Sequence, residues 1–378
     1  MVIPFTNLSQ FFSLYFHFPF CTKKCPYCHF FVLPDQENLK ISFLNGLLKE
    51  WELRYPSFQN KEIVSLYFGG GTPTLFPEGI KEILERAKSL HLSPNIEITV
   101  EANPEEVTPS LMQSLKEWGV NRISMGVQSF DDATLRILGR NHSAKKAITA
   151  IETIAEAGIE NISIDLMYEL PSQTVESWKE TVKQAATLPI THLSLYNLTF
   201  EPNTLYHKKR KELLPTLPKE ESNLEMLTFA CDVFETVGLK RYEISAFAKE
   251  NKVSIHNTGY WIGRPFLGFG PSAFSFFEGS RFRNHPHLNR YSEDLQIGKF
   301  PVDFEEKLPY PANVHELLAI RLRLFEGIDL NDFEMPRECY KILKELEEEG
   351  FLLEHGDRIT LTKQGHLFYD TIAEKIIL

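Results

Sequence analysis

The sequence predicts an α/β fold, in which a parallel sheet of six strand–helix units is followed by a small C-terminal domain of helices and strands. Short apolar strands alternate with helical patterns along residues 13–237, which is the order of βαβ units. Polar or glycine residues follow the strands directly, and sites in such sheets lie at the C-terminal ends of the strands. After residue 310 the pattern changes, and two short strands stand between helices.

The predicted strands are short and mostly apolar. The first covers residues 13–18 and places Leu14, Phe16 and Phe18 on one face, because side chains alternate across a strand. The others are expected over 63–68, 96–101, 122–127, 162–167 and 192–198, and residues 241–246 are also strand-like. We expect the first six to lie side by side in one parallel sheet.

Helices are predicted between the strands, where apolar residues recur at helical spacing. Pro77 suits the first turn of one helix and Ser143 the N-cap of another, while Gly119 and Gly158 follow helix ends. The predicted helices cover 39–55, 77–90, 109–118, 143–158, 175–188 and 220–237. Six such units form either a partial (βα)6 barrel or an open doubly wound sheet, and their pattern alone does not choose between the two.

The C-terminal region resembles a winged helix in the order of its elements. Helices are expected over 313–324 and 336–349, then a hairpin of 351–354 and 358–361, and a last helix after Lys363. Residues 336–378 contain six Lys or Arg and nine Asp or Glu, so we expect a packing or lid role instead of DNA binding. The expected domains are a core at 1–250, a Gly- and aromatic-rich linking segment at 251–310, and a C-terminal domain at 311–378.

The composition limits the classes of function. Of 378 residues, 43% are hydrophobic and 24% are charged, which is ordinary for a globular protein, and no apolar run is long enough to span a membrane. The net charge of −11 gives no reason to expect a nucleic-acid partner. The first 20 residues lack Lys and Arg, so we expect no secretory signal. Five cysteines form a poor disulfide framework and are typical of the reducing cytoplasm, where we expect the protein to reside.

Three of the five cysteines, Cys21, Cys25 and Cys28, lie within eight residues, directly after the first predicted strand. Three thiolates at this spacing can bind three irons of a four-iron, four-sulfur cluster and leave the fourth iron open to a small ligand. Zinc is the competing interpretation, and it requires a fourth ligand, for which His17 or His29 is available. The cysteines alone leave both possibilities open.

Further candidate residues follow the next strands. Gly69-Gly70-Gly71-Thr72 lets the backbone approach a ligand closely, although such a run also suits an ordinary strand–helix turn. Glu101, in Glu101-Ala102-Asn103-Pro104, can accept hydrogen bonds from hydroxyl groups, or it is simply a solvated charge. Gln128 and Arg140 follow the fourth strand, and Asp165 lies within the apolar fifth strand, where a carboxylate is costly unless it is hydrogen-bonded.

Together these segments resemble the radical S-adenosylmethionine (SAM) family, and within it the oxygen-independent coproporphyrinogen III oxidases and their relatives, the haem chaperones. The resemblance spans nearly the whole chain and implies a partial (βα)6 radical SAM barrel. It implies that Cys21, Cys25 and Cys28 ligate a [4Fe-4S] cluster whose open iron binds SAM, and that Tyr27 packs near the adenine. The apolar residues around the cysteines either exclude water from such a site or simply belong to the core; they are Phe16, Phe18, Phe20, Phe30 and Phe31. The implied SAM pocket consists of Tyr15, Gly71, Thr72, Glu101, Gln128, Arg140 and Asp165.

Three features favour the chaperones over the oxidases. Phe30 stands where the oxidases have a fourth cysteine, and about 20 residues precede Cys21 where the oxidases have a longer extension. His256-Asn257-Thr258-Gly259-Tyr260-Trp261 resembles a segment associated with haem binding in the chaperones, and an imidazole can ligate haem iron. The competing interpretation is a structural segment with a hydrogen-bonded histidine.

Some residues depart from the chaperone pattern. His29 replaces a common Asp, and Phe274 stands where relatives often have His, for which His285 or His287 could substitute. The basic run 207–211 either meets porphyrin propionates or is a solvated helix face.

The resemblance therefore implies a haem chaperone that holds a [4Fe-4S] cluster, SAM and haem, with His256 as the candidate haem ligand. The alternative is a radical decarboxylase of coproporphyrinogen III, so whether the chain is an enzyme stays open. The implied partners are haem, an acceptor protein and an electron donor, with no nucleic acid. The resemblance also allows a homodimer and a peripheral contact with a membrane-bound acceptor.

Overall fold

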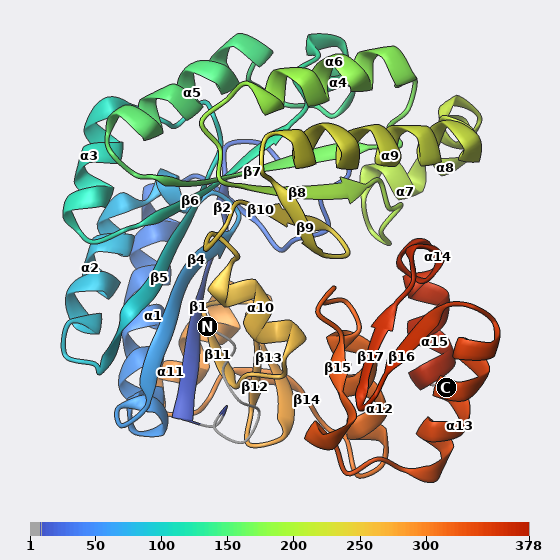
Figure 1. Ribbon diagram of the computed structural model, residues 1–378. Helices are drawn as coiled ribbons and strands as arrows, with labels where there is room; N and C mark the ends of the chain where they lie inside the picture. The colour runs from blue at the N-terminus through green and yellow to red at the C-terminus, as the bar shows by residue number, and fades with distance from the viewer. Residues whose placement is uncertain (1–7, 9, 378) are drawn as a thin grey trace.

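The computed structural model describes residues 8 and 10–377, and its main feature is a twelve-stranded mixed sheet (Figure 1). Six strands in the middle of the sheet run parallel and lie in chain order. They are β1 (Phe11–Phe18), β4 (Glu62–Gly70), β5 (Leu92–Ala102), β6 (Arg122–Gln128), β7 (Asn161–Tyr168) and β8 (His192–Asn197). The expectation about a secretory signal concerns residues 1–20, of which 1–7 and 9 lie outside the described residues.

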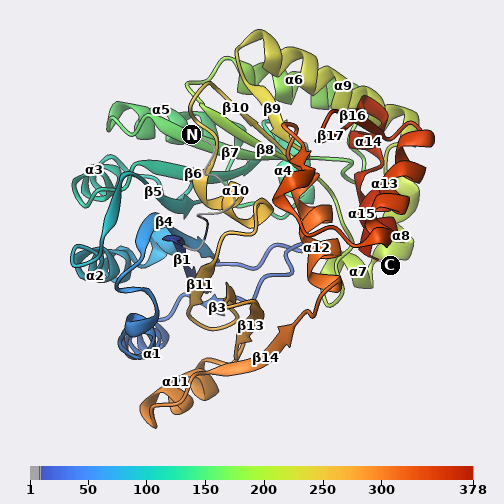
Figure 2. The same cartoon turned by 60° about the horizontal axis from the view of Figure 1, so that its bottom comes forward.

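The helices lie outside the curved sheet, as Figure 2 shows for α1, α2, α3, α5, α6 and α9. Right-handed crossovers between strands that pair in chain order place every helix on the same face, whereas a doubly wound sheet requires a reversal of strand order. The expected partial barrel is therefore confirmed, and the doubly wound alternative is excluded. The helices are α1 (Glu37–Phe58), α2 (Pro77–Ala87), α3 (Pro109–Glu117), α4 (Asp132–Ile137), α5 (Ala144–Glu156), α6 (Val175–Ala186) and α9 (Glu220–Thr236).

Alternation along the strands separates an apolar outer face from a polar interior. Leu14, Phe16 and Phe18 of β1 are fully buried against the helices, and Phe16 stacks on Phe68 of β4 at 5.0 Å between ring centroids. The alternate positions of each strand face the interior of the barrel. Ser13 in β1 and Ser65 in β4 are two of them, and their hydroxyl oxygens lie 2.8 Å apart. The strands thus bury apolar side chains outside and leave polar ones for a site inside.

The expected helix caps are present. The Ser143 hydroxyl accepts the Lys146 backbone N–H at the start of α5, Pro77 opens α2, and Gly119 follows α3 with a φ of +97°. The predicted bounds differ from the observed ones by a few residues, and the predicted 143–158 and 175–188 helices end at Glu156 and Ala186.

The single strand expected over 241–246 is wrong. The chain forms two antiparallel strands instead, β9 (Lys240–Glu243) and β10 (Ala246–Ala248), and β10 pairs antiparallel with β8. Ile244 and Ser245 make the reversal, because Arg241 Nε donates to the Ile244 carbonyl at 3.1 Å and Ser245 Oγ donates to Glu243 at 3.0 Å.

Residues 251–310, treated above as a linking segment, supply the other edge of the sheet. β11 pairs parallel with β1, and β12, β13 and β14 follow antiparallel. A buried network anchors this edge to α1, in which Glu50 accepts from Arg54, Asn284 and Tyr291. The elements are α10 (Ile255–Trp261), β11 (Phe266–Phe269), β12 (Phe274–Phe277), β13 (Ser280–Asn284), α11 (Leu288–Gln296) and β14 (Val302–Lys307).

The C-terminal domain has its own apolar core and the expected helix–hairpin–helix order. It contacts the barrel at β9, where Phe325 N–H donates to the Tyr242 carbonyl at 2.9 Å and Arg323 pairs with Glu243 at 3.2 Å. Its elements are α12 (Ala312–Arg321), β15 (Ile328–Asp329), α13 (Arg337–Glu348), β16 (Leu352–His355), β17 (Arg358–Leu361), α14 (Lys363–Leu367) and α15 (Tyr369–Ile377). Short elements elsewhere are β2 (Phe20–Cys21), β3 (Leu33–Pro34), α7 (Leu205–Lys208) and α8 (Arg210–Leu213).

Candidate functional site

The three-cysteine loop leaves the C-terminal end of β1 and is tied to the glycine-rich turn after β4. Gly71 N–H donates to the Phe18 carbonyl at 2.8 Å, and Thr72 N–H donates to the Phe20 carbonyl at 2.7 Å. A Cβ atom at Gly71 would lie 2.5 Å from the Phe20 carbonyl oxygen, which no side chain tolerates. The glycine is therefore required for the turn to pack directly against the backbone that precedes Cys21.

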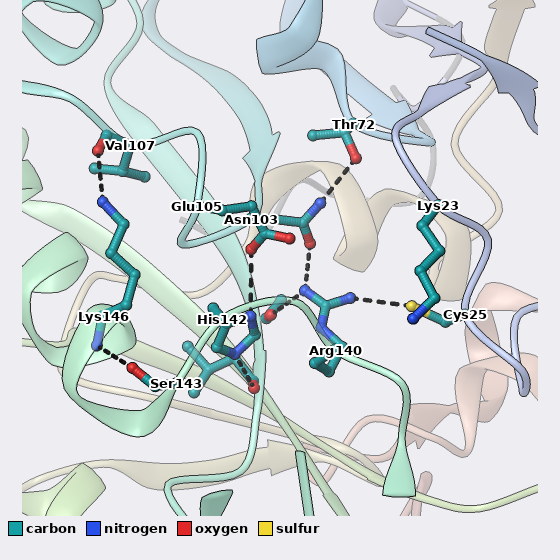
Figure 3. A network of polar contacts seen from close by, with 12 residues as sticks. Lys23, Cys25, Thr72, Asn103, Glu105, Val107, Arg140, His142, Ser143 and Lys146 are labelled. Carbon is teal, nitrogen blue, oxygen red and sulfur yellow. Dashed lines mark hydrogen bonds and ion pairs between the residues drawn. The ribbon is translucent and has the colours of Figure 1, made fainter. Parts of the chain in front are cut away.

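A chain of polar contacts, which we call the mouth network, joins Cys21 to Cys25 through Thr72, Asn103 and Arg140. Figure 3 shows its part from Thr72 to Cys25. Cys21 Sγ lies 3.8 Å from Thr72 Oγ1, and Asn103 Nδ2 donates to that same hydroxyl oxygen at 2.8 Å. Asn103 Oδ1 accepts from Arg140 Nη2, and Arg140 Nη1 donates to Cys25 Sγ at 3.5 Å. The network thus holds the cysteine loop against the ends of β4, β5 and β6.

Arg140 is the cation of this network. Its Nη2 also donates to the Gly126 carbonyl at 2.7 Å, while its buried Nε has no hydrogen-bond partner among the described residues. Burial opposes the charged form, but nearby Tyr27 and Cys25 outweigh this effect and raise the Arg140 pKa. A cation with a spare donor beside a pocket is suited to bind a carboxylate.

Gln128 and Asn103 converge on the same point. A Cβ atom at Gly126 would lie 3.0 Å from Gln128 Nε2, 3.3 Å from Asn103 Oδ1 and 3.4 Å from Arg140 Nη2. Gln128 itself has a φ of +68° at the end of β6, an uncommon conformation that functional sites often hold. Cys21, Cys25, Thr72, Asn103 and Arg140 all line one small pocket at this end of the barrel.

Asn103, Glu105 and His142 also belong to the site, although no sequence pattern had assigned them to it. Asn103 follows Glu101 by two residues, so its place at the strand end was the available signal. His142 donates from Nε2 to the Val127 carbonyl at 3.1 Å, and its Nδ1 lies 3.3 Å from Glu105 Oε2. Burial alone would raise the Glu105 pKa, but the contact with His142 leads to a net lowering.

Glu101 faces the barrel interior and is already hydrogen-bonded. Its carboxylate accepts from Tyr67 Oη at 2.8 Å and from Gly70 N–H at 3.0 Å. Burial raises its pKa to about 7, with Asp165 as a further contribution. A carboxylate has about four acceptor positions, so these two bonds leave room for the hydroxyl groups that Glu101 is expected to bind.

Asp165 and Tyr15 also face the interior. The Asp165 side chain is hydrogen-bonded with Ser194, the opposite residue on β8, and burial raises its pKa to about 6. Tyr15 Oη donates to His17 Nδ1 at 3.0 Å, because His17 Nε2 donates to the Phe31 carbonyl at 3.0 Å. Burial lowers the His17 pKa to about 4, so this imidazole is neutral and both its nitrogens are occupied.

Tyr27 packs beside the cysteine loop and next to the chain that follows β8. Its ring centroid lies 6.3 Å from that of Tyr206, and its hydroxyl is hydrogen-bonded with Cys25. Burial raises the Tyr27 pKa. The two tyrosines border a small apolar cluster with Leu138, Met167 and Leu170.

The aromatic residues near the cysteines divide into two groups. Phe16, Phe18 and Phe20 are fully buried in the main core, so they support the strand and do not line the site. Phe30 is 50% exposed and stacks on His29 at 4.6 Å. Phe31 is half-buried, with its ring centroid 6.5 Å from that of His17. Phe16, Phe18 and Phe20 are therefore core residues, as the alternative interpretation expected, and the shielding of the site from water stays a prediction.

His256 lies inside the barrel, on α10. Ser65 donates to Ser13 Oγ, so His256 Nδ1 donates to Ser65 Oγ at 2.9 Å, and Nε2 accepts from Tyr260 Oη at 2.8 Å. The ring is 1% exposed, and burial lowers its pKa well below the usual value. The assignment of His256 as a haem ligand stays a prediction, and it requires that Tyr260 or Ser65 release the imidazole.

The rest of the His256–Trp261 segment has structural contacts as well. Glu97 of β5 accepts the backbone N–H groups of Ile255 at 2.8 Å and His256 at 3.1 Å, at the start of α10. A Cβ atom at Gly259 would lie 2.9 Å from the Arg264 guanidinium carbon, so glycine makes room for that buried cation. Trp261 packs under Arg323 of the C-terminal domain at 4.3 Å.

The donor set fits a cluster better than a single ion. In the described part of the chain, no three His, Cys, Asp or Glu side chains converge as they would on one metal ion. A four-iron cluster makes a different demand, because each cysteine binds a separate iron. His17, one proposed fourth ligand for zinc, has both nitrogens hydrogen-bonded, and the unpartnered Arg140 Nε suits the carboxylate of SAM.

Comparison with known proteins agrees with this architecture. Residues 15–185 match the model of the radical SAM superfamily, and residues 308–368 match that of the HemN C-terminal domain. The chain is 32% identical to the haem chaperone HemW of Bacillus subtilis, over 94% of this chain and 96% of that protein. It is 30% identical to HemW of Escherichia coli, over 96% of this chain and 97% of that protein.

Two further similarities extend the comparison. A mitochondrial radical SAM domain-containing protein 1 of Danio rerio is 38% identical, over 97% of this chain and 87% of that protein. The solved structure of coproporphyrinogen III oxidase (HemN) from Escherichia coli has a TM-score of 0.84 and 23% identity, over 98% of this chain and 92% of that one. At this level of identity the similarity shows the fold alone.

Among the helices of the described residues, none is long and apolar enough to cross a membrane.

Proposed function

Since the chain belongs to the HemW family of radical SAM proteins, we propose that it is a haem chaperone that binds haem and passes it to an acceptor protein. The observation that carries this proposal is the similarity to named haem chaperones, which extends over nearly the full length of both chains. The mouth network supports the radical SAM part of the proposal, because it brings cysteines, a buried cation and strand-end polar groups to one pocket.

Cys21, Cys25 and Cys28 would hold the [4Fe-4S] cluster, and the ends of β4 to β7 would hold SAM. When bound together, the reduced cluster and SAM supply one-electron cleavage of the sulfonium bond. Arg140 would bind the carboxylate of SAM through its free Nε, and Asn103 fixes the guanidinium by accepting from Nη2. Glu101 would accept from ribose hydroxyls.

The remaining SAM-pocket assignments are Tyr15, Tyr27, Gly71, Thr72, Gln128 and Asp165. Gly71, Thr72 and Gln128 lie at strand ends and Tyr27 in the cysteine loop, whereas Tyr15 and Asp165 lie within β1 and β7. Gly71 and Thr72 give the turn that packs on the cysteine loop. Burial favours the neutral carboxyl of Asp165, and with a pKa of about 6 it can change protonation near neutral pH.

The test is a haem titration of the anaerobically reconstituted protein, followed by difference spectroscopy, with His256→Ala and His285→Ala as matched variants. Saturable one-to-one binding by the wild type supports the chaperone. If His256 ligates the iron, its variant alone loses or shifts the haem bands. If both variants keep the wild-type spectrum, the His256 segment is structural and another residue binds the iron.

The contrary result is absence of saturable binding together with turnover of coproporphyrinogen III. Anaerobic incubation with reductant and SAM, followed by mass spectrometry, would detect the loss of carbon dioxide from the propionates. That outcome would replace the chaperone with the decarboxylase.

A further inference from the structure

An exposed basic surface lies beside the cysteine loop in an otherwise acidic chain. Residues 22–31 and 205–214 together contain six Lys or Arg and one Asp or Glu, whereas the whole chain has 40 Lys or Arg and 51 Asp or Glu. All six cations are exposed, and we call them the basic patch. They are Lys23, Lys24, Lys208, Lys209, Arg210 and Lys211.

The two segments of the basic patch are held together by contacts. Tyr206 N–H donates to the Pro26 carbonyl at 3.1 Å, inside the cysteine loop, and the rings of Tyr206 and Tyr27 lie 6.3 Å apart. The short helices α7 and α8 follow the C-terminal end of β8 (Figure 1) and carry three of the cations, and Lys209 lies between the two helices. Lys23 Nζ donates to the Gly139 carbonyl at 3.3 Å, next to Arg140 of the mouth network.

The charges of the basic patch are not neutralised within the described part of the chain. None of the six cations has an ion pair, whereas lysines elsewhere commonly do, as Lys49 with Glu52 and Lys88 with Glu85 illustrate. In a chain of net charge −11, a cluster of unpaired cations creates a local positive potential that attracts an acidic partner.

Apolar side chains accompany these charges. Phe30 is 50% exposed, Leu205 49% and Leu214 53%. Ile137, whose carbonyl accepts from Tyr206 Oη at 2.6 Å, is 37% exposed. Exposed apolar groups surrounded by charge are typical of protein–protein interfaces.

We propose that the basic patch and its apolar residues dock a small acidic one-electron carrier protein, which reduces the [4Fe-4S] cluster through the cysteine loop. This inference rests on the cluster of the proposed function. The transfer moves one electron from the reduced carrier to the cluster, so the carrier is oxidised by one electron, the cluster is reduced by one, and no bond or proton moves. Docking here brings the carrier beside the residues that hold its electron acceptor.

The experiment uses the anaerobically reconstituted full chain and an acidic plant-type ferredoxin, which is a low-potential one-electron carrier. The dissociation constant of the complex and the rate of cluster reduction by stopped flow are both measured. The patch variant is Lys208→Glu, Lys209→Glu and Lys211→Glu. The control is Lys145→Glu, Lys240→Glu and Lys344→Glu, which changes exposed lysines and the net charge equally.

We expect the patch variant to bind the ferredoxin about tenfold more weakly or worse and to slow cluster reduction in proportion, because its local field is reversed. The control is expected to lose about twofold at most, and both differences should shrink at about 0.5 M salt, where charges are screened. Glutamine at the same three patch positions should give a smaller loss in the same direction.

Equal losses in the patch and control variants would overturn the proposal, because they would show an effect of net charge alone. Binding to phosphatidylserine vesicles that depends on the patch, with unchanged ferredoxin affinity, would overturn it in favour of a membrane surface. Haem titration of the same samples separates the two proposals. Patch-dependent ferredoxin binding without haem binding would sustain the docking surface and refute the chaperone.

Discussion

The two ends of the barrel interior differ in what their polar groups face. At the C-terminal ends of the strands, Thr72, Asn103 and Arg140 line a pocket beside the cysteines, and Arg140 keeps a donor without a partner in the described residues. Nearer the strand starts, Glu97 and His256 are buried among α10, β4 and β5. Glu97 accepts the backbone N–H groups of Ile255 and His256, and the His256 imidazole bonds to Ser65 and Tyr260.

This difference shows that burial decides which end of the barrel interior can bind a ligand and which end only stabilises the fold. A polar group that faces a pocket can exchange a protein or water contact for a ligand at small cost, whereas one that is enclosed must break a buried bond first. The mouth network is therefore suited to hold cofactors, and the enclosed region around α10 is suited to hold the helix that closes the barrel interior.

The largest expected effect comes from breaking the enclosed end. Glu97→Ala removes three acceptor contacts to residues 254–256 and also removes a buried carboxylate that favours the charged forms of nearby Arg264 and Arg122. Removing one partner of a buried charged group costs about 3–5 kcal/mol, and we expect a loss near the lower value in denaturant unfolding. Glu348→Ala, at an exposed position, should change stability by less than about 0.5 kcal/mol. A loss that small for Glu97→Ala would show that α10 is held by other contacts.

A second test concerns Glu101, which lies in the barrel interior and is buried but keeps free acceptor positions. Burial raises the Glu101 pKa from its ordinary value to about 7, so the folded state binds this proton more tightly than the unfolded state. The contribution of Glu101 to the stability of the cluster-free protein should therefore fall as pH rises from about 4.5 to 7, by about 3 kcal/mol, and then level off. Buried histidines such as His17, whose pKa is lowered, contribute in the opposite direction over this range. Glu101→Gln removes only the first contribution, so its stability, measured by urea unfolding across pH, should rise more steeply with pH than that of the wild type. An unchanged slope would assign the proton to another group, such as Asp165.

The smallest effect is expected at the mouth network. Asn103→Ala removes the bridge between Thr72 and Arg140, which leaves the guanidinium less fixed but still present. We expect SAM to bind about tenfold more weakly, which is about 1.4 kcal/mol, by isothermal titration of the reconstituted protein. The iron content and the cluster absorbance should stay at wild-type values. SAM affinity equal to that of the wild type would show that Asn103 does not position Arg140 for the ligand.

The sequence by itself determined the alternating strands and helices, the C-terminal hairpin and the strand-end position of the candidate residues. These features are local, because periodicity, caps and turn residues act within a few positions of the chain. The cysteine loop directly after a strand is one such local feature, whereas the assignment of Thr72 and Arg140 to a cofactor pocket depends on the resemblance to the radical SAM family.

Only the tertiary structure decided which polar atoms are partnered and which are available. The hydrogen bond between Ser65 and His256 joins residues that are 191 positions apart in the sequence. No local sequence pattern indicates that the His256 imidazole has this partner. The same holds for Asn103, which becomes part of the site because Thr72 and Arg140 reach it from other strands. Residues 251–310 are a further example of a contact between distant parts of the sequence. They add strands to the edge of the sheet because β11 pairs with β1, which lies near the start of the chain.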